Sequence, residues 1–70
     1  MTTERWRVWE NQTTLIADEV ENMEKAVEIA KKHHSAFPDR YHEVYRFEPS
    51  YGKFIGVCQW KPGDPVSVGE

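Results

Sequence analysis

The chain of 70 residues has few of the features that usually stabilise so short a domain. It contains a single cysteine, Cys58, so no disulfide can form within the chain and no Cys-x-x-Cys pair is present to bind zinc. No segment approaches the roughly 20 apolar residues of a membrane-spanning helix, and the first residues lack the apolar run of a signal peptide. The sequence therefore predicts a cytoplasmic protein without membrane association.

Sequence signatures of catalysis and of cofactor binding are also missing. The glycines are isolated and form no phosphate-binding loop, and no hydrolase, kinase or dinucleotide-binding motif occurs. We therefore expect no catalytic residues, no cofactor and no enzymatic activity. The net charge of −3 opposes nucleic acid at long range, although it permits a local basic patch.

Three histidines, His33, His34 and His42, lie within ten residues of one another. Neighbouring residues of a helix point about 100° apart, so His33 and His34 cannot bind one metal by themselves. We therefore expect no metal site, and interpret these histidines as helix-end and surface residues. Cys58 paired with His42 would form a nucleophile dyad only if the strand register given below shifted by one residue.

The aromatic residues provide bulk for packing: three tryptophans, three tyrosines and three phenylalanines. Four segments have the composition of β-strands, at residues 5–10, 13–20, 40–47 and 53–60. Asn11 and Gln12 form a connection of hairpin length between the first two. Pro49 and Gly52 are turn residues between the last two. The alternative for residues 13–20 is a loop.

Between the two hairpins the sequence predicts one helix, which Asn22 begins as a capping residue and Pro38 ends. Its apolar residues recur at helical spacing: Met23, Ala26, Val27, Ala30 and Phe37. The prediction is an α+β domain over residues 1–61 in the order ββαββ, or βαββ if residues 13–20 form a loop. Residues 62–70, which contain two prolines and two glycines, are predicted to be a flexible tail.

Pairing Glu48 with Lys53 in the last hairpin aligns Phe47 with Phe54 and Tyr45 with Gly56. This register predicts one sheet face under the helix, made of Trp6, Val8, Leu15, Ala17, Tyr41, Tyr45, Phe47, Phe54, Cys58 and Trp60. The opposite face is left open because the chain has only one helix to cover it. Its residues are Arg7, Trp9, Ile16, His42, Val44, Arg46, Ile55, Val57 and Gln59.

An open face that combines arginine, tryptophan and aliphatic side chains is typical of a binding surface. The predicted binding residues are Arg7, Trp9, His42, Val44, Arg46, Ile55, Val57 and Gln59. We expect a protein partner. It is either a second copy of the chain in a homodimer or a larger protein that this chain binds as an inhibitor or adaptor. The size suits an accessory protein of a phage or mobile element. The alternative is a nucleic-acid-binding module that stacks bases on the same face.

Overall fold

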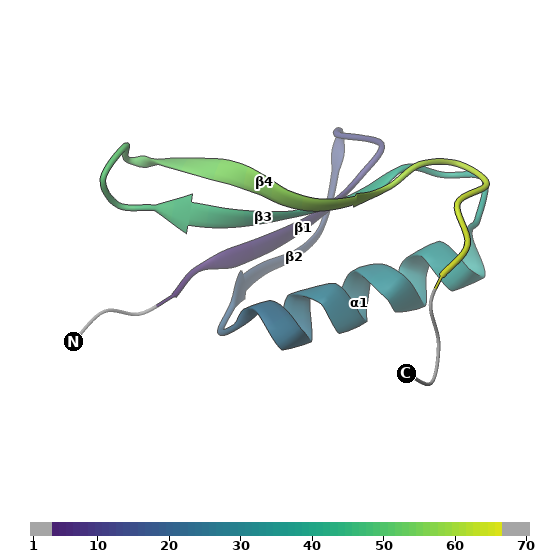
Figure 1. The fold of residues 1–70 in the computed structure, drawn as a ribbon, viewed down its shortest axis with the longest axis horizontal. Helices are drawn as coiled ribbons and strands as arrows, with labels where there is room; N and C mark the ends of the chain where they lie inside the picture. Colours follow the sequence, from purple (N-terminus) through teal and green to yellow (C-terminus); the bar gives the residue numbers. More distant parts are fainter. Residues whose placement is uncertain (1–3, 67–70) are drawn as a thin grey trace.

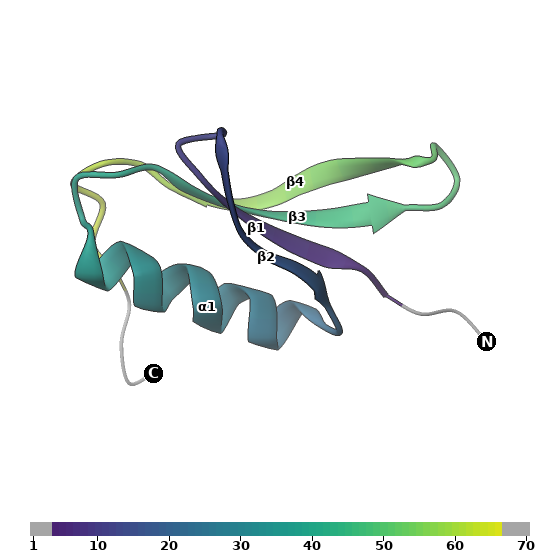
Figure 2. The ribbon, with the colours of Figure 1, turned by 180° about the vertical axis from the view of Figure 1, so that it is seen from behind.

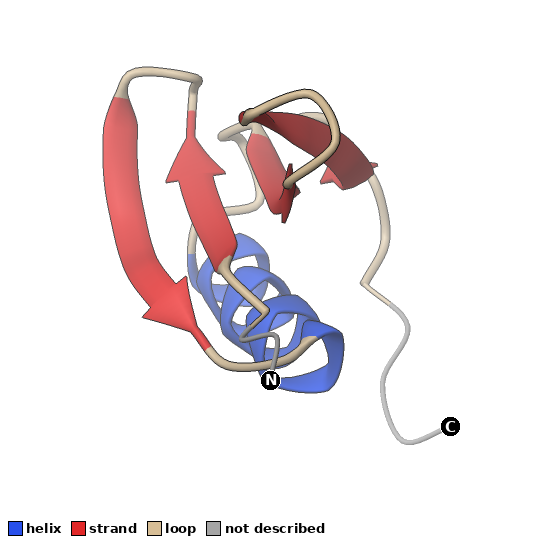
Figure 3. Cartoon of the chain, turned by 90° about the vertical axis from the view of Figure 1, so that its left-hand side faces the viewer, coloured by secondary structure: helices blue, strands red, loops and turns tan. Residues whose placement is uncertain are grey.

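The computed structural model describes residues 4–66, which form an antiparallel sheet with one helix on one side (Figures 1 and 3). The elements are β1 (Trp6–Glu10), β2 (Thr14–Val20), α1 (Met23–Ala36), β3 (His42–Glu48) and β4 (Lys53–Trp60). The four strands lie in the order β2-β1-β3-β4. The predicted α+β class and the order ββαββ are confirmed, including the strand at Thr14–Val20.

The turn between β1 and β2 has two residues in the left-handed region, Asn11 at φ 54° and Gln12 at φ 61°. Two consecutive positive φ angles give the turn the twist that antiparallel strands need, and the amide of Thr13 closes it on the carbonyl of Glu10 at 3.1 Å. Asn11 also joins this turn to β3. Its amide donates to the carbonyl of Tyr41 at 2.6 Å, and its Oδ1 accepts from the amide of Tyr41 at 3.0 Å.

Helix α1 begins as its sequence predicts. Asn22 lies outside the helix with extended backbone, and its Oδ1 accepts from the amide of Lys25 at 2.9 Å. That bond satisfies one of the free amides at the helix start. Lys25 also pairs with Glu21 at 2.6 Å. At the other end the amide of Phe37 bonds to the carbonyl of His33 at 2.8 Å.

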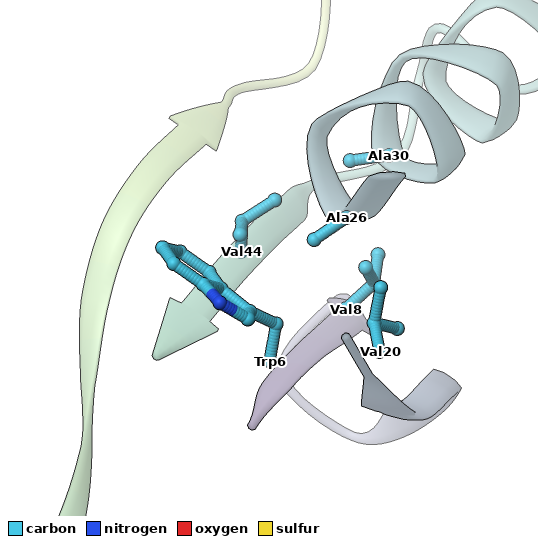
Figure 4. Close-up of a cluster of buried hydrophobic side chains, with 6 residues drawn as sticks. All are labelled: Trp6, Val8, Val20, Ala26, Ala30 and Val44. Atoms are coloured by element: carbon cyan, nitrogen blue, oxygen red, sulfur yellow. The ribbon is translucent and has the colours of Figure 1, made fainter. Parts of the chain in front are cut away.

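The apolar core lies between α1 and the middle of the sheet (Figure 4). The helix contributes two small side chains to it, Ala26 and Ala30, and packs on β1, β2 and β3. Small residues let the helix backbone approach the larger side chains of the strands. The buried apolar residues are Trp6, Val8, Val20, Ala26, Ala30 and Val44.

Strand β4 contains an irregularity that changes which of its residues face the helix. Near the turn the pairing is as predicted, with Phe47 opposite Phe54 and Tyr45 opposite Gly56. The next pair is Val44 with Cys58, so Val57 is an extra residue in β4. Because side chains alternate along a strand, this bulge moves Cys58 to the face opposite that of Gly56.

The two faces that were predicted for β3 are wrong. His42 and Val44, which were predicted on the open face, are both 0% exposed on the helix side. Tyr45, which was predicted under the helix, pairs with Arg7 of β1 on the opposite face. The alternation of β3 is therefore the reverse of the prediction, whereas Trp6 and Val8 of β1 face the helix as expected.

The end of the β3–β4 hairpin extends past the first turn of α1, so neither side of it lies under the helix (Figures 1 and 2). Arg46 pairs with Trp6 and Ile55, which places both Arg46 and Ile55 on the helix side rather than on the predicted open face. Ile55 is 37% exposed, and Val57 at the bulge is 44% exposed.

The segment after β4 returns to the end of α1. The amide of Gly63 donates to the carbonyl of Pro38 at 2.8 Å, and the carbonyl of Asp64 lies 3.1 Å from Nε2 of His34. The predicted tail is therefore attached at these two residues, and its last part, residues 67–70, lies outside the described residues. Within residues 4–66, no helix is long and apolar enough to cross a membrane.

The register of β4 is tested by two matched substitutions. Val44→Ala removes two buried methyl groups and should lower the free energy of unfolding by about 2 kcal/mol. Val57→Ala makes the same change at a side chain that is 44% exposed, and its effect should be much smaller. Urea denaturation followed by circular dichroism measures both. Equal losses, or a larger loss at Val57, would contradict the bulge.

Candidate functional site

The sheet face away from α1 is dominated by aromatic side chains from three strands. We call it the aromatic face and define it by residues that share this side in the strand pairing: Arg5, Arg7, Trp9, Tyr41, Glu43, Tyr45, Phe47, Phe54 and Gln59. The helix lies on the other side, and no further described element packs over this face (Figure 3). Large aromatic groups that the fold does not cover are typical of a binding surface.

Two arginines cover one end of the aromatic face. The guanidinium of Arg7 lies 4.1 Å from the ring centre of Phe54, and that of Arg5 lies 5.1 Å from the ring centre of Phe47. Such cation–π contacts attract the arginines to the aromatic rings of the sheet. Nε of Arg7 also bonds to Oδ1 of Asp18 at 2.8 Å, and this hydrogen bond lowers the pKa of the Asp18 carboxyl.

A hollow of about 220 Å³ lies at the other end, lined by Trp9, Gln12 and Tyr45. Glu43 is the direct cross-strand partner of Trp9 and does not itself line the hollow. The hydroxyl of Tyr45 donates to Oε1 of Glu43 at 2.8 Å. Burial, together with that carboxylate, raises the pKa of Tyr45 to about 12. The tyrosine therefore remains a neutral donor at physiological pH.

The structure brings together only some of the predicted binding residues. Arg7, Trp9 and Gln59 lie on the aromatic face, and Gln59 accepts a hydrogen bond from Tyr41 at 2.7 Å. The other predicted residues lie on the helix side or at the bulge: His42, Val44, Arg46, Ile55 and Val57.

The sequence prediction did not include most of the aromatic face. The missed residues are Arg5, Tyr41, Glu43, Tyr45, Phe47 and Phe54. One signal could have found them, because an isolated glycine inside a strand pattern, here Gly56, indicates a bulge. A bulge at that point moves the residues that precede it in β4 to the face opposite that of the residues that follow it.

A second cluster is a chain of polar groups buried at the helix side. Nδ1 of His34 lies 2.8 Å from Nδ1 of His42, and Nε2 of His42 lies 3.3 Å from Oε2 of Glu10. Arg40 pairs with the same Glu10 oxygen at 3.3 Å. This series of polar contacts ends at the carbonyl of Asp64, which lies 3.1 Å from Nε2 of His34. His42 is thus a buried structural residue and not the predicted surface residue.

The direction of two of these hydrogen bonds follows from the acceptor at one end. The Glu10 carboxylate only accepts, so Nε2 of His42 donates to it. Burial lowers the pKa of His42, which favours the neutral ring, so its Nδ1 then accepts from Nδ1 of His34.

The two histidines of this buried cluster are closed to solvent in the structure. Both histidines have 0% exposure, so a substrate cannot reach their ring nitrogens. In the described part of the chain, no three His, Cys, Asp or Glu side chains are grouped in a way that could hold a metal ion. Cys58 is half-buried on the helix side opposite Val44. The role that these contacts support is to join α1, β1, β3 and the segment around Asp64.

Comparison with known proteins adds no functional assignment. No protein-family model, curated protein or solved structure matches the chain. The geometry of the candidate site is therefore the basis for proposing a function.

His42 should make the stability of the domain depend on pH. Burial lowers the pKa of His42, and its hydrogen bond with Glu10 offsets this only in part. The unfolded chain therefore binds a proton at this residue at a higher pH than the folded chain does. The free energy of unfolding should then fall as the pH drops through the ordinary histidine pKa of about 6.5 towards the lower folded value.

Urea denaturation between about pH 7.5 and about pH 5.5 measures this effect. Because other groups titrate in the same range, the comparison is with His42→Gln, which keeps a polar side chain but cannot titrate. The stability of the parent should decrease more steeply with falling pH than that of the variant. Identical slopes, or a parent that gains stability on acidification relative to the variant, would contradict the assignment.

Proposed function

We propose that the protein is a non-enzymatic binding module, and that its aromatic face pairs with the same face of a second copy. The observation that carries this proposal is that three strands and the residue before β3 present five aromatic rings on a side that no described element covers. The rings belong to Trp9, Tyr41, Tyr45, Phe47 and Phe54. In this proposal the protein acts in the reducing cytoplasm, where the lone thiol of Cys58 stays free.

The small core supports association. Of the six buried apolar side chains, two are alanines, so the helix and sheet remove little apolar area from water. Domains of this size often gain the missing stability from a partner. Covering the aromatic face would bury the part of these rings that the isolated chain leaves exposed.

The distribution of charge supports a protein partner, and a second copy in particular. The aromatic face has cations at one end, Arg5 and Arg7, and the Glu43 carboxylate at the other. A surface with both signs can be complementary to itself under a two-fold axis, as a symmetric dimer requires. Asp18 and Glu19 already pair with Arg7 and Arg5, which lowers the net positive charge at this end and disfavours a phosphate partner more than a protein partner.

Nucleic acid is the second candidate, and one observation favours it. The open face carries aromatic rings and arginines instead of the expected aliphatic residues, and stacking platforms for single strands have that composition. Two features oppose it: Arg7 is held by Asp18 and Phe54, and Glu43 would repel phosphates. A protein partner is therefore the better-supported proposal.

The proposal predicts that Trp9→Ala weakens self-association. Loss of a central aromatic residue at an interface typically costs on the order of 2 kcal/mol, so the dissociation constant should rise by more than about tenfold. Sedimentation equilibrium of the parent and the variant over a wide concentration range measures this, and circular dichroism checks that both are folded. The matched control is Tyr51→Ala, which removes a ring that is 68% exposed in the β3–β4 turn.

A parent that stays monomeric at every concentration would contradict the homodimer, as would a dimer that Trp9→Ala does not weaken. A single-stranded oligonucleotide is then titrated into the parent at low and high salt. Binding that falls steeply with salt and is lost in Trp9→Ala would establish the nucleic-acid alternative in its place.

A further inference from the structure

The chain after β4 returns to the end of α1, where two contacts attach it (Figure 1). We call residues 61–64 the return segment. The amide of Gly63 donates to the carbonyl of Pro38 at 2.8 Å. The carbonyl of Asp64 lies 3.1 Å from Nε2 of His34, whose side chain is closed to solvent. The residues of the return segment are themselves exposed, so its attachment depends on these polar contacts more than on apolar burial.

The contact between His34 and Asp64 needs a hydrogen that a neutral His34 does not have. Nδ1 of His34 donates to Nδ1 of His42 at 2.8 Å. A neutral imidazole carries only one N–H, so Nε2 would turn a lone pair towards the carbonyl of Asp64. Two acceptors at 3.1 Å repel each other, and a buried ring nitrogen would be left without a donor. With a second hydrogen, on Nε2, His34 is an imidazolium and every contact from Glu10 to Asp64 is a hydrogen bond.

Two negative groups near His34 favour this second hydrogen. His34 lies in the last turn of α1, where the partial negative charge of the helix end attracts a cation. The carboxylate of Glu10, which His42 contacts, adds a negative charge on the side of β1. Arg40 opposes the imidazolium, but its side chain is 44% exposed and water screens its charge.

His42 is the neutral member of the pair. Burial lowers its pKa, and the charges of His34 and His33 lower it further. The ring centre of His33 lies 6.3 Å from that of His42. The other titratable groups towards this end of the helix are Lys31 and Lys32 on α1, Asp39 in the connection to β3, Cys58 on β4, and Lys61 and Asp64 in the return segment.

We propose that the return segment is a pH-dependent latch, which is closed when His34 carries two ring hydrogens and opens when one of them is lost. In the closed form the imidazolium donates to His42 and to the carbonyl of Asp64 at the same time. After the loss of a proton, Nε2 needs a donor. Water can provide one only when the segment has moved away, because His34 is closed to solvent. This inference does not depend on the proposed function.

The direction of the pH dependence follows from proton uptake. The closed latch holds one proton more than the open, neutral form, so a lower pH favours closing. This gain is lost as the pH rises through the range in which imidazoles lose their proton, between about pH 5 and about pH 8. His42 sets the lower limit of the closed form. A proton on its Nδ1 would face the Nδ1 hydrogen of His34, so protonation of both rings breaks the pair.

The first test locates the hydrogens on the histidine rings of the parent chain. A long-range proton–nitrogen NMR correlation distinguishes a ring nitrogen that carries a hydrogen from one that does not. At about pH 6 we expect hydrogens on both nitrogens of His34, and on Nε2 alone in His42. A neutral His34 at this pH, in a chain whose Gly63 amide is still protected from exchange, would overturn the latch.

The second test measures the attachment of the return segment. Hydrogen exchange of the Gly63 amide, relative to an unstructured chain at the same pH, reports its bond to Pro38. This protection should fall by about tenfold or more between about pH 6 and about pH 8, because one charge-assisted hydrogen bond is lost. The internal control is Gly52, whose amide donates to the carbonyl of Glu48 at 2.8 Å in the β3–β4 turn. Its protection should not change in the same way.

Two matched variants assign the effect to one histidine. His34→Gln keeps a polar side chain that does not titrate, so the protection of Gly63 should be the same at both pH values. His33→Gln removes the neighbouring, half-buried histidine and should keep the change seen in the parent. The latch is wrong if Gly63 shows no pH dependence in the parent, or the same dependence in His34→Gln. If His34→Gln does not fold, the ring hydrogens and the Gly63 exchange of the parent still decide.

Discussion

The close contact of Ala26 and Ala30 with Val8 and Val44 determines which parts of the sheet are covered (Figure 4). A helix is about 10 Å across with its side chains, and neighbouring strands lie about 4.8 Å apart, so one helix covers about two strands. Here it covers the two central strands, β1 and β3, together with part of β2. No element within residues 4–66 covers the outer part of β4 or the opposite side of the sheet, and the candidate site follows from this geometry.

The extra residue in β4 gives the two sides of the sheet different chemistry. It places Cys58 on the helix side together with Val44 and His42 of β3. Phe54, which precedes the bulge, lies on the other side with Tyr45 and Phe47. His42 has 0% exposure and must find polar partners, which it does in His34 and Glu10. The same arrangement places Glu43 among aromatic rings, without a cation from the described chain. The buried chain stabilises the fold, whereas the aromatic face is available to a partner.

Most of the fold could be predicted from the sequence, because each element has a local signal. Asn22 marks the helix start, and the period of the alanines marks the buried stripe. The faces of β3 could not be predicted from apolar alternation. Its outward set contains Tyr45 and Phe47 and is the more apolar one, so hydrophobicity favoured burying it. The deciding features are the bulge in β4 and the pairing of β1 with β3, and neither can be read from the composition of β3 alone.

Strand β3 presents Val44 to the helix and Tyr45 to the open side of the sheet. A carbon-edited nuclear Overhauser experiment on the labelled protein tests this arrangement, because it reports which protons lie within a few ångströms of one another. We expect cross-peaks from the methyl groups of Val44 to those of Ala26 or Ala30, and from the ring of Tyr45 to Arg7 or Trp9. Cross-peaks from the Tyr45 ring to the alanines of α1, with none from Val44, would contradict it.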